Sequence, residues 1–154
     1  MKTLVLFSDS HNTPLSESFK QVLDEADFVV FCGDGIEGLA NYLNRPNFYA
    51  VRGNCDGISL PDEIEFTVED VKVFATHGHL YKVKSGLLNL EYKAKEVGAD
   101  LVLYGHTHCA DITTDGNITL INGGSMSYSY LGERSYCYVV IDKKNIIAKI
   151  VKIA

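Results

Sequence analysis

The chain has 154 residues, of which 46% are hydrophobic and 22% are charged, and we expect a single globular domain spanning residues 1–154. The formal net charge of −6 argues against an extended nucleic-acid-binding surface, which requires many Lys and Arg side chains. No apolar run approaches the roughly 20 residues of a membrane-spanning helix, so we expect no membrane partner.

The chain has four cysteines: Cys32, Cys55, Cys109 and Cys137. They form no CxxC pair and no dense framework, a pattern that favours reduced thiols over structural disulfides. Met1 and Lys2 lead directly into a strand-like apolar run, without a signal-peptide pattern. We therefore expect a cytoplasmic protein.

The first half of the chain alternates short apolar runs with patterns of helical spacing. Strands are predicted at residues 2–8, 28–32 and 48–51, and helices at residues 14–25 and 35–44. Thr13 is expected to cap the first helix, because Pro14 suits the first helical position. Strands that alternate with helices over short connections favour parallel pairing through crossover helices.

The second half of the chain favours antiparallel pairing. Hairpins are predicted over residues 63–76, 112–121 and 136–153, a strand over residues 101–104 and a helix over residues 84–97. Parallel and antiparallel strands therefore occur together with about three helices. The elements predict an α/β fold in which two mixed sheets pack together with the helices outside.

All five histidines lie in short clusters with glycine, asparagine or aspartate, directly after apolar runs. They are His11, His77, His79, His106 and His108. Asp9, Asp34 and Asn54 follow other strand-like runs in the same way. Because open α/β folds bind ligands beyond the carboxyl ends of their strands, we expect most of these side chains to converge on one point.

These donors combine imidazole, carboxylate and amide groups without an obvious thiolate. The mixture suits Mn²⁺, Fe, Zn²⁺ or Ni²⁺ better than an all-oxygen site for Mg²⁺ or Ca²⁺. The set is also too large for one tetrahedral ion, whereas two ions about 3.5–4 Å apart would use it, with one carboxylate as a bridge. A metal site of this composition points to hydrolytic chemistry.

Five separated motifs occur in order along the chain: Asp9-x-His11, Gly33-Asp34, Gly53-Asn54, His77-Gly78 and Gly105-His106-x-His108. In this order they resemble the calcineurin-like metallophosphoesterases. The short chain and the Gly-Asn-Cys-Asp sequence at 53–56 are similar to the small YfcE-type phosphodiesterase branch, and the resemblance extends to the Asn-Gly-Gly-Ser segment at 122–125. It implies a four-layer αββα sandwich with a dinuclear metal centre.

The resemblance also implies which residues would hold the two metal ions. The first ion would be held by Asp9, His11, Asp34 and His108, and the second by Asp34, Asn54, His77 and His106. Asp34 would bridge the ions, and a hydroxide formed from a bridging water would attack phosphorus in line with the leaving oxygen. Mn²⁺ is the expected ion, with Ni²⁺, Zn²⁺ and Fe also compatible with this ligand set.

One position departs from the pattern of many relatives, which carry histidine after the Gly-Asn pair where this chain has Cys55. A thiol is a weak hydrogen-bond donor, so we expect activity biased toward diesters or toward esters with good leaving groups. His79 or Asp56 could supply the missing donor instead. The expected catalytic residues are therefore Asp34, Asn54, Cys55 and His79.

Three further residues are candidate substrate contacts: Ser10, Asn12 and Asp56. Ser10 and Asn12 flank the first motif, where turn stabilisation is the commoner role of such side chains. Arg52 and Arg134 are weaker candidates for phosphate contacts. The tyrosines between residues 128 and 138 suggest either hairpin packing, a subunit interface or a stacking wall for a base.

The leading interpretation is a metal-dependent phosphodiesterase that acts on a small phosphate ester. Two alternatives stay open: a phosphomonoesterase that uses the same centre, and a non-catalytic metal-binding scaffold, because the resemblance includes a retromer subunit with this fold. A chain released from catalysis should lose ligands, and here every ligand position is filled, which favours an enzyme. Substrate, native metal and oligomeric state, a homodimer included, stay open.

Overall fold

A computed structural model describes residues 1–57, 60–127 and 133–153, and in these ranges the strands form two five-stranded sheets. The first sheet has the order β10-β9-β1-β2-β3 and consists of β1 (Lys2–Phe7), β2 (Phe28–Phe31), β3 (Phe48–Ala50), β9 (Arg134–Asp142) and β10 (Asn145–Ile153). The second has the order β4-β5-β6-β8-β7 and consists of β4 (Glu63–Val68), β5 (Val71–Thr76), β6 (Leu101–Tyr104), β7 (Asp111–Asp115) and β8 (Ile118–Asn122).

Each sheet is mixed, as the sequence predicts. β1, β2 and β3 are parallel, and so are β5, β6 and β8. The antiparallel partners are β9 and β10 in the first sheet and β4 and β7 at the two edges of the second. The central parallel strands are apolar on both faces because each face is covered, and β6 is buried along its whole length.

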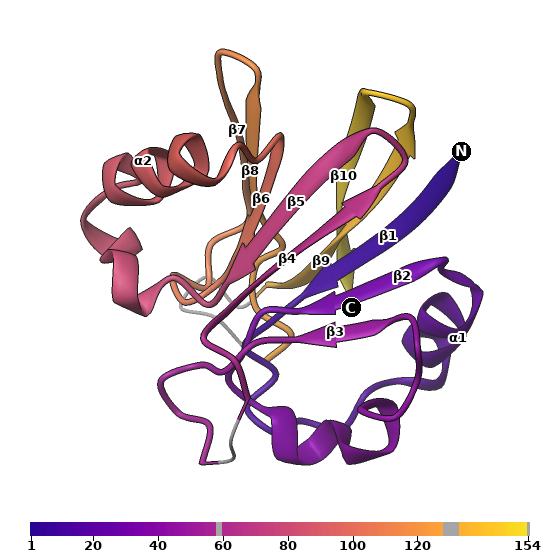
Figure 1. Cartoon of the computed structure of the whole chain (residues 1–154). Helices are drawn as coiled ribbons and strands as arrows, with labels where there is room; N and C mark the ends of the chain where they lie inside the picture. The colour runs from indigo at the N-terminus through magenta and orange to yellow at the C-terminus, as the bar shows by residue number, and fades with distance from the viewer. Residues whose placement is uncertain (58–59, 128–132, 154) are drawn as a thin grey trace.

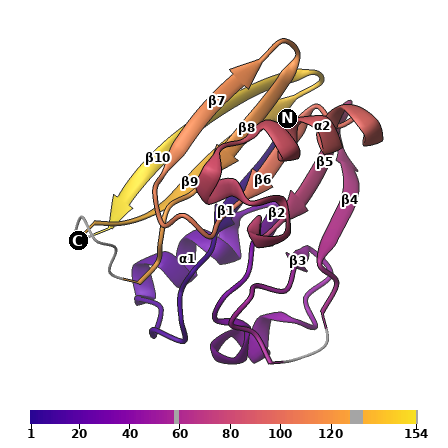
Figure 2. The same cartoon turned by 90° about the vertical axis from the view of Figure 1, so that its left-hand side faces the viewer.

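The helical segments lie outside the two sheets. They are α1 (Glu17–Glu25), α2 (Leu88–Val97) and the 3-10 segments η1 (Ile36–Tyr42), η2 (His79–Tyr81) and η3 (Val83–Ser85). Leu23 of α1 packs with Phe7 on the outer face of the first sheet, and Leu90 of α2 packs with Phe74 on the outer face of the second. Figures 1 and 2 show the two α-helices on opposite sides of the paired sheets. The four-layer αββα arrangement is thereby confirmed.

A continuous apolar layer joins the inner faces of the two sheets. Leu6 and Val30 of the first sheet and Ala75 and Leu103 of the second are fully buried in one cluster. Apolar surface removed from water stabilises a fold by roughly 25 cal/mol per Å², so this layer contributes to holding the two sheets together. It also fixes how the loops of one sheet face the loops of the other. No helix among the described residues is long and apolar enough to cross a membrane.

The first helix begins later than the sequence predicts. It starts at Glu17 with Ser16 as its cap, because the Ser16 hydroxyl accepts the N–H of Phe19. The expectation that Thr13 caps this helix is wrong. The Thr13 N–H instead donates to the Ser10 carbonyl in a turn, which leaves Pro14 outside the helix.

The other two predicted helices are also shorter than expected. The predicted 35–44 helix is the 3-10 segment η1, which is interrupted by non-helical dihedral angles at Leu39. The predicted 84–97 helix is divided into η3 and α2, because Gly86 has φ 121° and ψ 173°, which no helix accommodates. In both cases a local backbone break overrides the apolar periodicity.

The loops after the parallel strands of both sheets meet at one edge of the sandwich. The His77 imidazole Nδ1, after β5, donates to the Cys32 carbonyl, after β2, over 2.6 Å. The His106 N–H, after β6, donates to the Asp9 carboxylate, after β1, over 3.0 Å. The carboxyl ends of strands from two different sheets therefore build a single site.

Candidate metal centre

Five of the seven predicted ligands have left-handed backbone, a conformation that side-chain-bearing residues rarely adopt. Their φ values are 55° for Asp9, 46° for His11, 66° for Asp34, 72° for His106 and 62° for His108. Such strain persists only where the surrounding structure imposes it, and it gathers at functional sites. The five strained positions all lie in loops that follow β1, β2 and β6.

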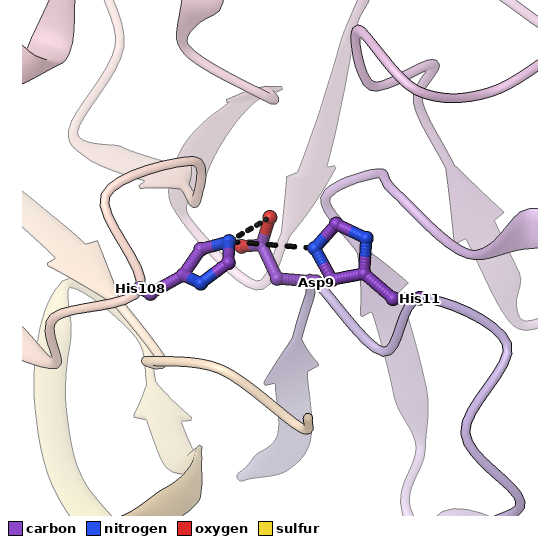
Figure 3. Close-up of side chains that lie close together, drawn as sticks. All are labelled: Asp9, His11 and His108. Carbon is purple, nitrogen blue, oxygen red and sulfur yellow. Dashed lines mark hydrogen bonds and ion pairs between the residues drawn. The ribbon is translucent and has the colours of Figure 1, made fainter. Parts of the chain in front are cut away.

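The first group of potential ligands consists of Asp9, His11 and His108. His108 Nε2 lies 3.4 Å from Asp9 Oδ1 and 3.4 Å from His11 Nε2. Figure 3 shows the two imidazole rings on either side of the Asp9 carboxylate, with their nitrogens directed toward one another. The three donor atoms lie within 4.8 Å of one another, a spacing at which they could hold one metal ion.

The second group consists of Asp34, His77 and His106. His77 Nε2 lies 3.3 Å from Asp34 Oδ2 and 3.1 Å from His106 Nδ1. The carbonyl of Cys32 can only accept a hydrogen bond, so it fixes Nδ1 of His77 as a donor and directs Nε2 into the centre. A carbonyl that orients an imidazole from behind is a common support for metal-binding histidines.

A third group, His11, Asp34 and Cys55, connects the first two. Asp34 Oδ1 accepts the N–H of Cys55 over 2.8 Å, while Asp34 Oδ2 faces His77. Asn54 is exposed on the same loop, and its amide nitrogen lies 3.6 Å from Cys55 Sγ, which leaves the amide oxygen as the atom available to an ion. Asp34 thus lies between the two histidine groups.

The two carboxylates at the centre are deeply buried, Asp9 with 0% and Asp34 with 2% of their surface exposed. Oδ1 of Asp9 has no hydrogen-bond partner among the described residues, although it lies 3.4 Å from His108 Nε2 and 3.8 Å from His77 Nε2. A buried carboxylate oxygen without a donor is costly unless a cation compensates it. This oxygen therefore fits a divalent ion.

The charges at the centre shift the pKa values of its groups. Burial works to raise the pKa of Asp34, but the hydrogen bond and charge of His77 and the N–H of Cys55 outweigh it and hold that pKa below its ordinary value. Burial works to lower the pKa of His77, yet the carboxylates of Asp34 and Asp9 raise it overall. Burial and the charge of His77 lower the pKa of His106 to about 4. The His106 imidazole is therefore uncharged at neutral pH, and its lone pair is available to a metal ion.

Residues behind the ligands hold the Asp9 carboxylate in place. Its Oδ2 accepts the Ser8 hydroxyl over 2.7 Å and the N–H of His106 over 3.0 Å. Gly105 passes so close that a Cβ there would lie 2.8 Å from this oxygen and 2.5 Å from the Ser8 hydroxyl. Asn122 donates its side-chain amide to the Gly105 carbonyl over 3.1 Å and fixes the same loop. The supporting roles of Ser8 and Asn122 are not evident from the sequence, because only the fold brings them to this loop.

Asp56 is buried, and both of its carboxylate oxygens accept backbone N–H groups. Oδ1 accepts from Gly35 and Ile36, and Oδ2 accepts from Asp34 and Gly53, over distances of 2.8–3.1 Å. The side chain therefore ties the loop after β2 to the loop after β3. These contacts of Asp56 are with backbone groups and stabilise the two loops. A contact between Asp56 and substrate stays a prediction.

The remaining candidates lie around the centre with different surroundings. Ser10 is buried, and its hydroxyl has no hydrogen-bond partner within the described ranges, whereas the Asn12 side chain accepts the N–H of Gly38 over 3.0 Å. The His79 ring is half-buried, with its centroid 5.4 Å from that of His77. Burial and the positive charge of His77 lower the pKa of His79.

Among the weaker candidates, Arg52 lies near the centre, since its charge contributes to the lowered pKa of His79. Arg52 forms a surface ion pair with Asp62 over 3.2 Å, the commoner fate of such a side chain. Tyr136 packs on Phe19 of α1, with ring centroids 4.9 Å apart. Tyr128 and Tyr130 lie outside the residues that the structure describes. Tyr136 therefore contributes to the packing of the β9–β10 hairpin against α1.

An open cavity of about 450 Å³ lies beside the centre. Its lining consists of Val83, Lys84, His106, Thr107, His108 and Cys109. Lys84 brings a positive charge whose influence reaches both histidines. Sequence reasoning does not identify Lys84 as a neighbour of the site, because η3 reaches it only through the tertiary fold. The cavity has room for the part of a small ligand that extends beyond the centre.

Residues 1–145 match the sequence model of the calcineurin-like phosphoesterase superfamily domain. The chain belongs to this superfamily. It is 32% identical to the probable metallophosphoesterase YsnB of Bacillus subtilis over 147 residues, which cover 92% of this chain and 85% of YsnB. It is 30% identical to the phosphodiesterase YfcE of Escherichia coli over an alignment of 188 residues, which covers 97% of this chain and 98% of YfcE.

Solved structures of the calcineurin-like phosphoesterase fold agree with this assignment. A predicted phosphoesterase from Streptococcus pneumoniae superposes with a TM-score of 0.79 at 26% identity, covering 98% of this chain and 97% of its own. A single mutant of Vps29 from Entamoeba histolytica superposes with a TM-score of 0.78 at 18% identity, covering 99% of each chain, a likeness in fold alone. The resemblance drawn from the five sequence motifs is confirmed.

Proposed function

We propose that the chain is a phosphoesterase that works with two divalent metal ions and hydrolyses a small phosphate diester in the cytoplasm. The observation that carries this proposal is the overlap of the three ligand groups, because His11 belongs to two of them and so does Asp34. An overlap of this kind suits two neighbouring ions that share a carboxylate better than it suits one isolated ion. Membership of the superfamily supports the reaction class.

The residues present fit divalent metal ions in their chemistry as well as in their number. They offer imidazole nitrogens and carboxylate oxygens, the donors that Mn²⁺, Fe, Zn²⁺ and Ni²⁺ share. The buried Oδ1 of Asp9, which has no hydrogen-bond partner in the described part of the chain, and the 3.4 Å approach of His11 to His108 are both compatible with a bound cation. We propose Mn²⁺ as the working ion, with the other three as candidates.

We assign the ligands as the sequence motifs imply. One ion would be held by Asp9, His11, Asp34 and His108, and the other by Asp34, Asn54, His77 and His106. When bound, the ions supply Lewis acidity toward a phosphoryl oxygen and lower the pKa of water. The protein holds the proposed ligand atoms in position before substrate arrives, through left-handed loop residues and buried supporting hydrogen bonds.

The groups that would meet the leaving oxygen lie on two sides of the centre. Cys55 is exposed beside Asp34, and the half-buried His79 ring lies beside His77. A thiol is a weak donor, so a leaving group that needs little protonation would react best. This supports the preference for diesters or for esters with good leaving groups, whose remaining part would enter the cavity beside Lys84.

The test is hydrolysis of a chromogenic phosphodiester and of the matching monoester by metal-stripped protein. Mn²⁺, Ni²⁺, Zn²⁺ and Mg²⁺ are added back separately, with Asp34→Ala as the variant and Ser10→Ala as the comparison. Metal-dependent turnover that Asp34→Ala abolishes and Ser10→Ala largely keeps is the expected result, with the diester hydrolysed faster. Equal loss in both variants would contradict the bridging role of Asp34.

The runner-up is a metal-binding scaffold, since structures of Vps29 share the fold. The filled ligand positions favour the enzyme, because a chain released from catalysis is free to lose ligands. Two ions bound per chain without turnover of either ester would favour the scaffold. A monoester hydrolysed faster than the diester would move the assignment to a phosphomonoesterase.

A further inference from the structure

Cys55 occupies a position at which its sulfur can reach a metal ion at the centre. Its Sγ, an imidazole nitrogen of His11 and a carboxylate oxygen of Asp34 all lie within 4.8 Å of one another. The three residues follow β3, β1 and β2, which are neighbouring parallel strands of the first sheet. Their meeting is therefore a property of the sheet edge and not of one flexible loop.

The spacing of the three atoms suits coordination of one ion after a small movement. Ligands at about 2.0–2.3 Å from a zinc-like ion lie roughly 3.3–4.5 Å from each other, depending on geometry. The backbone on which Cys55 stands is already held, because its N–H donates to Asp34 Oδ1 over 2.8 Å and the adjacent Asp56 is clamped by backbone N–H groups.

A second observation indicates that an ion belongs at this place. His11, which faces Cys55 and Asp34 on one side, faces His108 on the other at 3.4 Å. His108 in turn lies 3.4 Å from the fully buried Asp9 Oδ1, which has no hydrogen-bond partner in the described part of the chain. The sulfur is therefore next to a cation site that rests on evidence other than the cysteine.

We propose that Cys55 is a metal ligand for thiophilic ions, joining His11 and Asp34 when Zn²⁺, Co²⁺ or Cd²⁺ occupies the centre. The proposal rests on the metal-binding part of the proposed function. On binding, the S–H bond of Cys55 breaks, the sulfur forms a bond to the ion and the proton passes to solvent. Mn²⁺ and Mg²⁺ favour oxygen and imidazole donors over thiolate and leave the thiol uncoordinated. The same chain would thus bind hard and soft ions in two different ways.

This assignment has a consequence for ion selection. An ion that takes the sulfur as a ligand withdraws Cys55 from the substrate side of the centre and adds a negative charge to the metal site. Thiophilic ions should then bind more tightly and support less turnover than Mn²⁺. Cys55 would make the centre selective for soft ions over hard ions. Imidazole and carboxylate ligands alone discriminate less strongly between the two classes.

Cobalt(II) spectroscopy on metal-stripped protein tests the assignment without reference to activity. Bound Co²⁺ shows visible ligand-field bands whatever its donors, and a thiolate ligand adds a sulfur-to-cobalt charge-transfer band in the near ultraviolet. Wild-type protein is expected to show both. Cys55→Ser should keep the visible bands and lose the ultraviolet band. The matched control is Cys109→Ser, because Cys109 is exposed beside His108 but belongs to none of the three ligand groups; it should keep both.

The outcomes separate this assignment from the proposed function. Visible bands without a charge-transfer band in the wild type, or a band that survives Cys55→Ser, would overturn the sulfur ligand and leave the metal centre standing. No cobalt spectrum at all would overturn the metal centre and the sulfur ligand together. In a parallel titration, Cys55→Ser should weaken Cd²⁺ binding on the order of tenfold or more and change Mn²⁺ binding by less than about twofold. Equal effects on both ions would also contradict the assignment.

Discussion

Replacing Asp56 by asparagine should destabilise the protein strongly, although the side chain keeps its shape. Oδ1 accepts the N–H groups of Gly35 at 2.8 Å and Ile36 at 3.1 Å, and Oδ2 accepts those of Asp34 at 2.9 Å and Gly53 at 2.8 Å. An asparagine has one oxygen and one NH₂ group. Whichever way its amide is turned, the NH₂ group faces two backbone donors, which lose their acceptor.

The size of the effect follows from those two unpaired donors. A buried donor left without a partner costs about 1–3 kcal/mol, so the pair costs roughly 2–6 kcal/mol. For a chain of this length each kcal/mol lowers the melting temperature by about 2–4 °C, and a loss of about 4 kcal/mol corresponds to roughly 10 °C. Because proteins are stabilised by only about 5–15 kcal/mol in total, the variant should fold but with a much smaller margin.

Urea and thermal unfolding of the metal-free protein measure this effect. The matched control is Asp24→Asn, which removes a charge from a surface ion pair with Arg45 and should cost less than about 1 kcal/mol. The two loops that Asp56 joins carry the proposed ligands Asp34 and Asn54, so the variant should also bind Mn²⁺ more weakly. An Asp56→Asn variant no less stable than Asp24→Asn would refute the clamp.

Three further predictions concern the centre itself. Gly53→Ala should weaken metal binding at least about tenfold and destabilise the fold by a few kcal/mol, because a Cβ there would lie 2.0 Å from Asp34 Oδ1. The calorimetric control is Gly57→Ala, which should change little, because among the described residues its Cβ would meet Glu37 alone, at 3.5 Å. Mn²⁺ at 100 times its dissociation constant should stabilise the wild type by about 2.7 kcal/mol per bound ion in thermal unfolding, roughly 5 kcal/mol for two ions, and Asp34→Ala should lose most of this gain. Cys55→His should raise monoesterase activity relative to diesterase activity, since imidazole is the better proton donor; an unchanged ratio would show that this side chain does not face the leaving group.

The strands, and the convergence of most of the expected ligand residues, could be predicted from the sequence because both leave local signals. Short apolar runs mark the buried strands, and the polar residues that follow them lie at the carboxyl ends, where parallel strands bring them together. Asp9 and His106 are separated by 97 positions, yet each directly follows its own strand. The topology alone places them within hydrogen-bonding distance.

The helix boundaries and the supporting contacts could not be predicted, because they depend on the tertiary structure. Thr13 and Ser16 are both plausible caps by residue type, and only the turn at Ser10 decides between them. The clamp by Asp56 exists because two loops approach it from different strands. The nearness of Cys55 to His11 likewise arises from the sheet edge, where no spacing along the chain indicates it.

The central claim is that two ions at this centre carry the reaction, and a Mn²⁺ titration followed by native mass spectrometry and diester hydrolysis tests it most directly. Metal occupancy and turnover are measured on the same samples of metal-stripped protein. The account predicts two ions per chain at saturation, with hydrolysis rising as the second ion binds. A plateau at one ion per chain, or full hydrolysis without added metal, would contradict it.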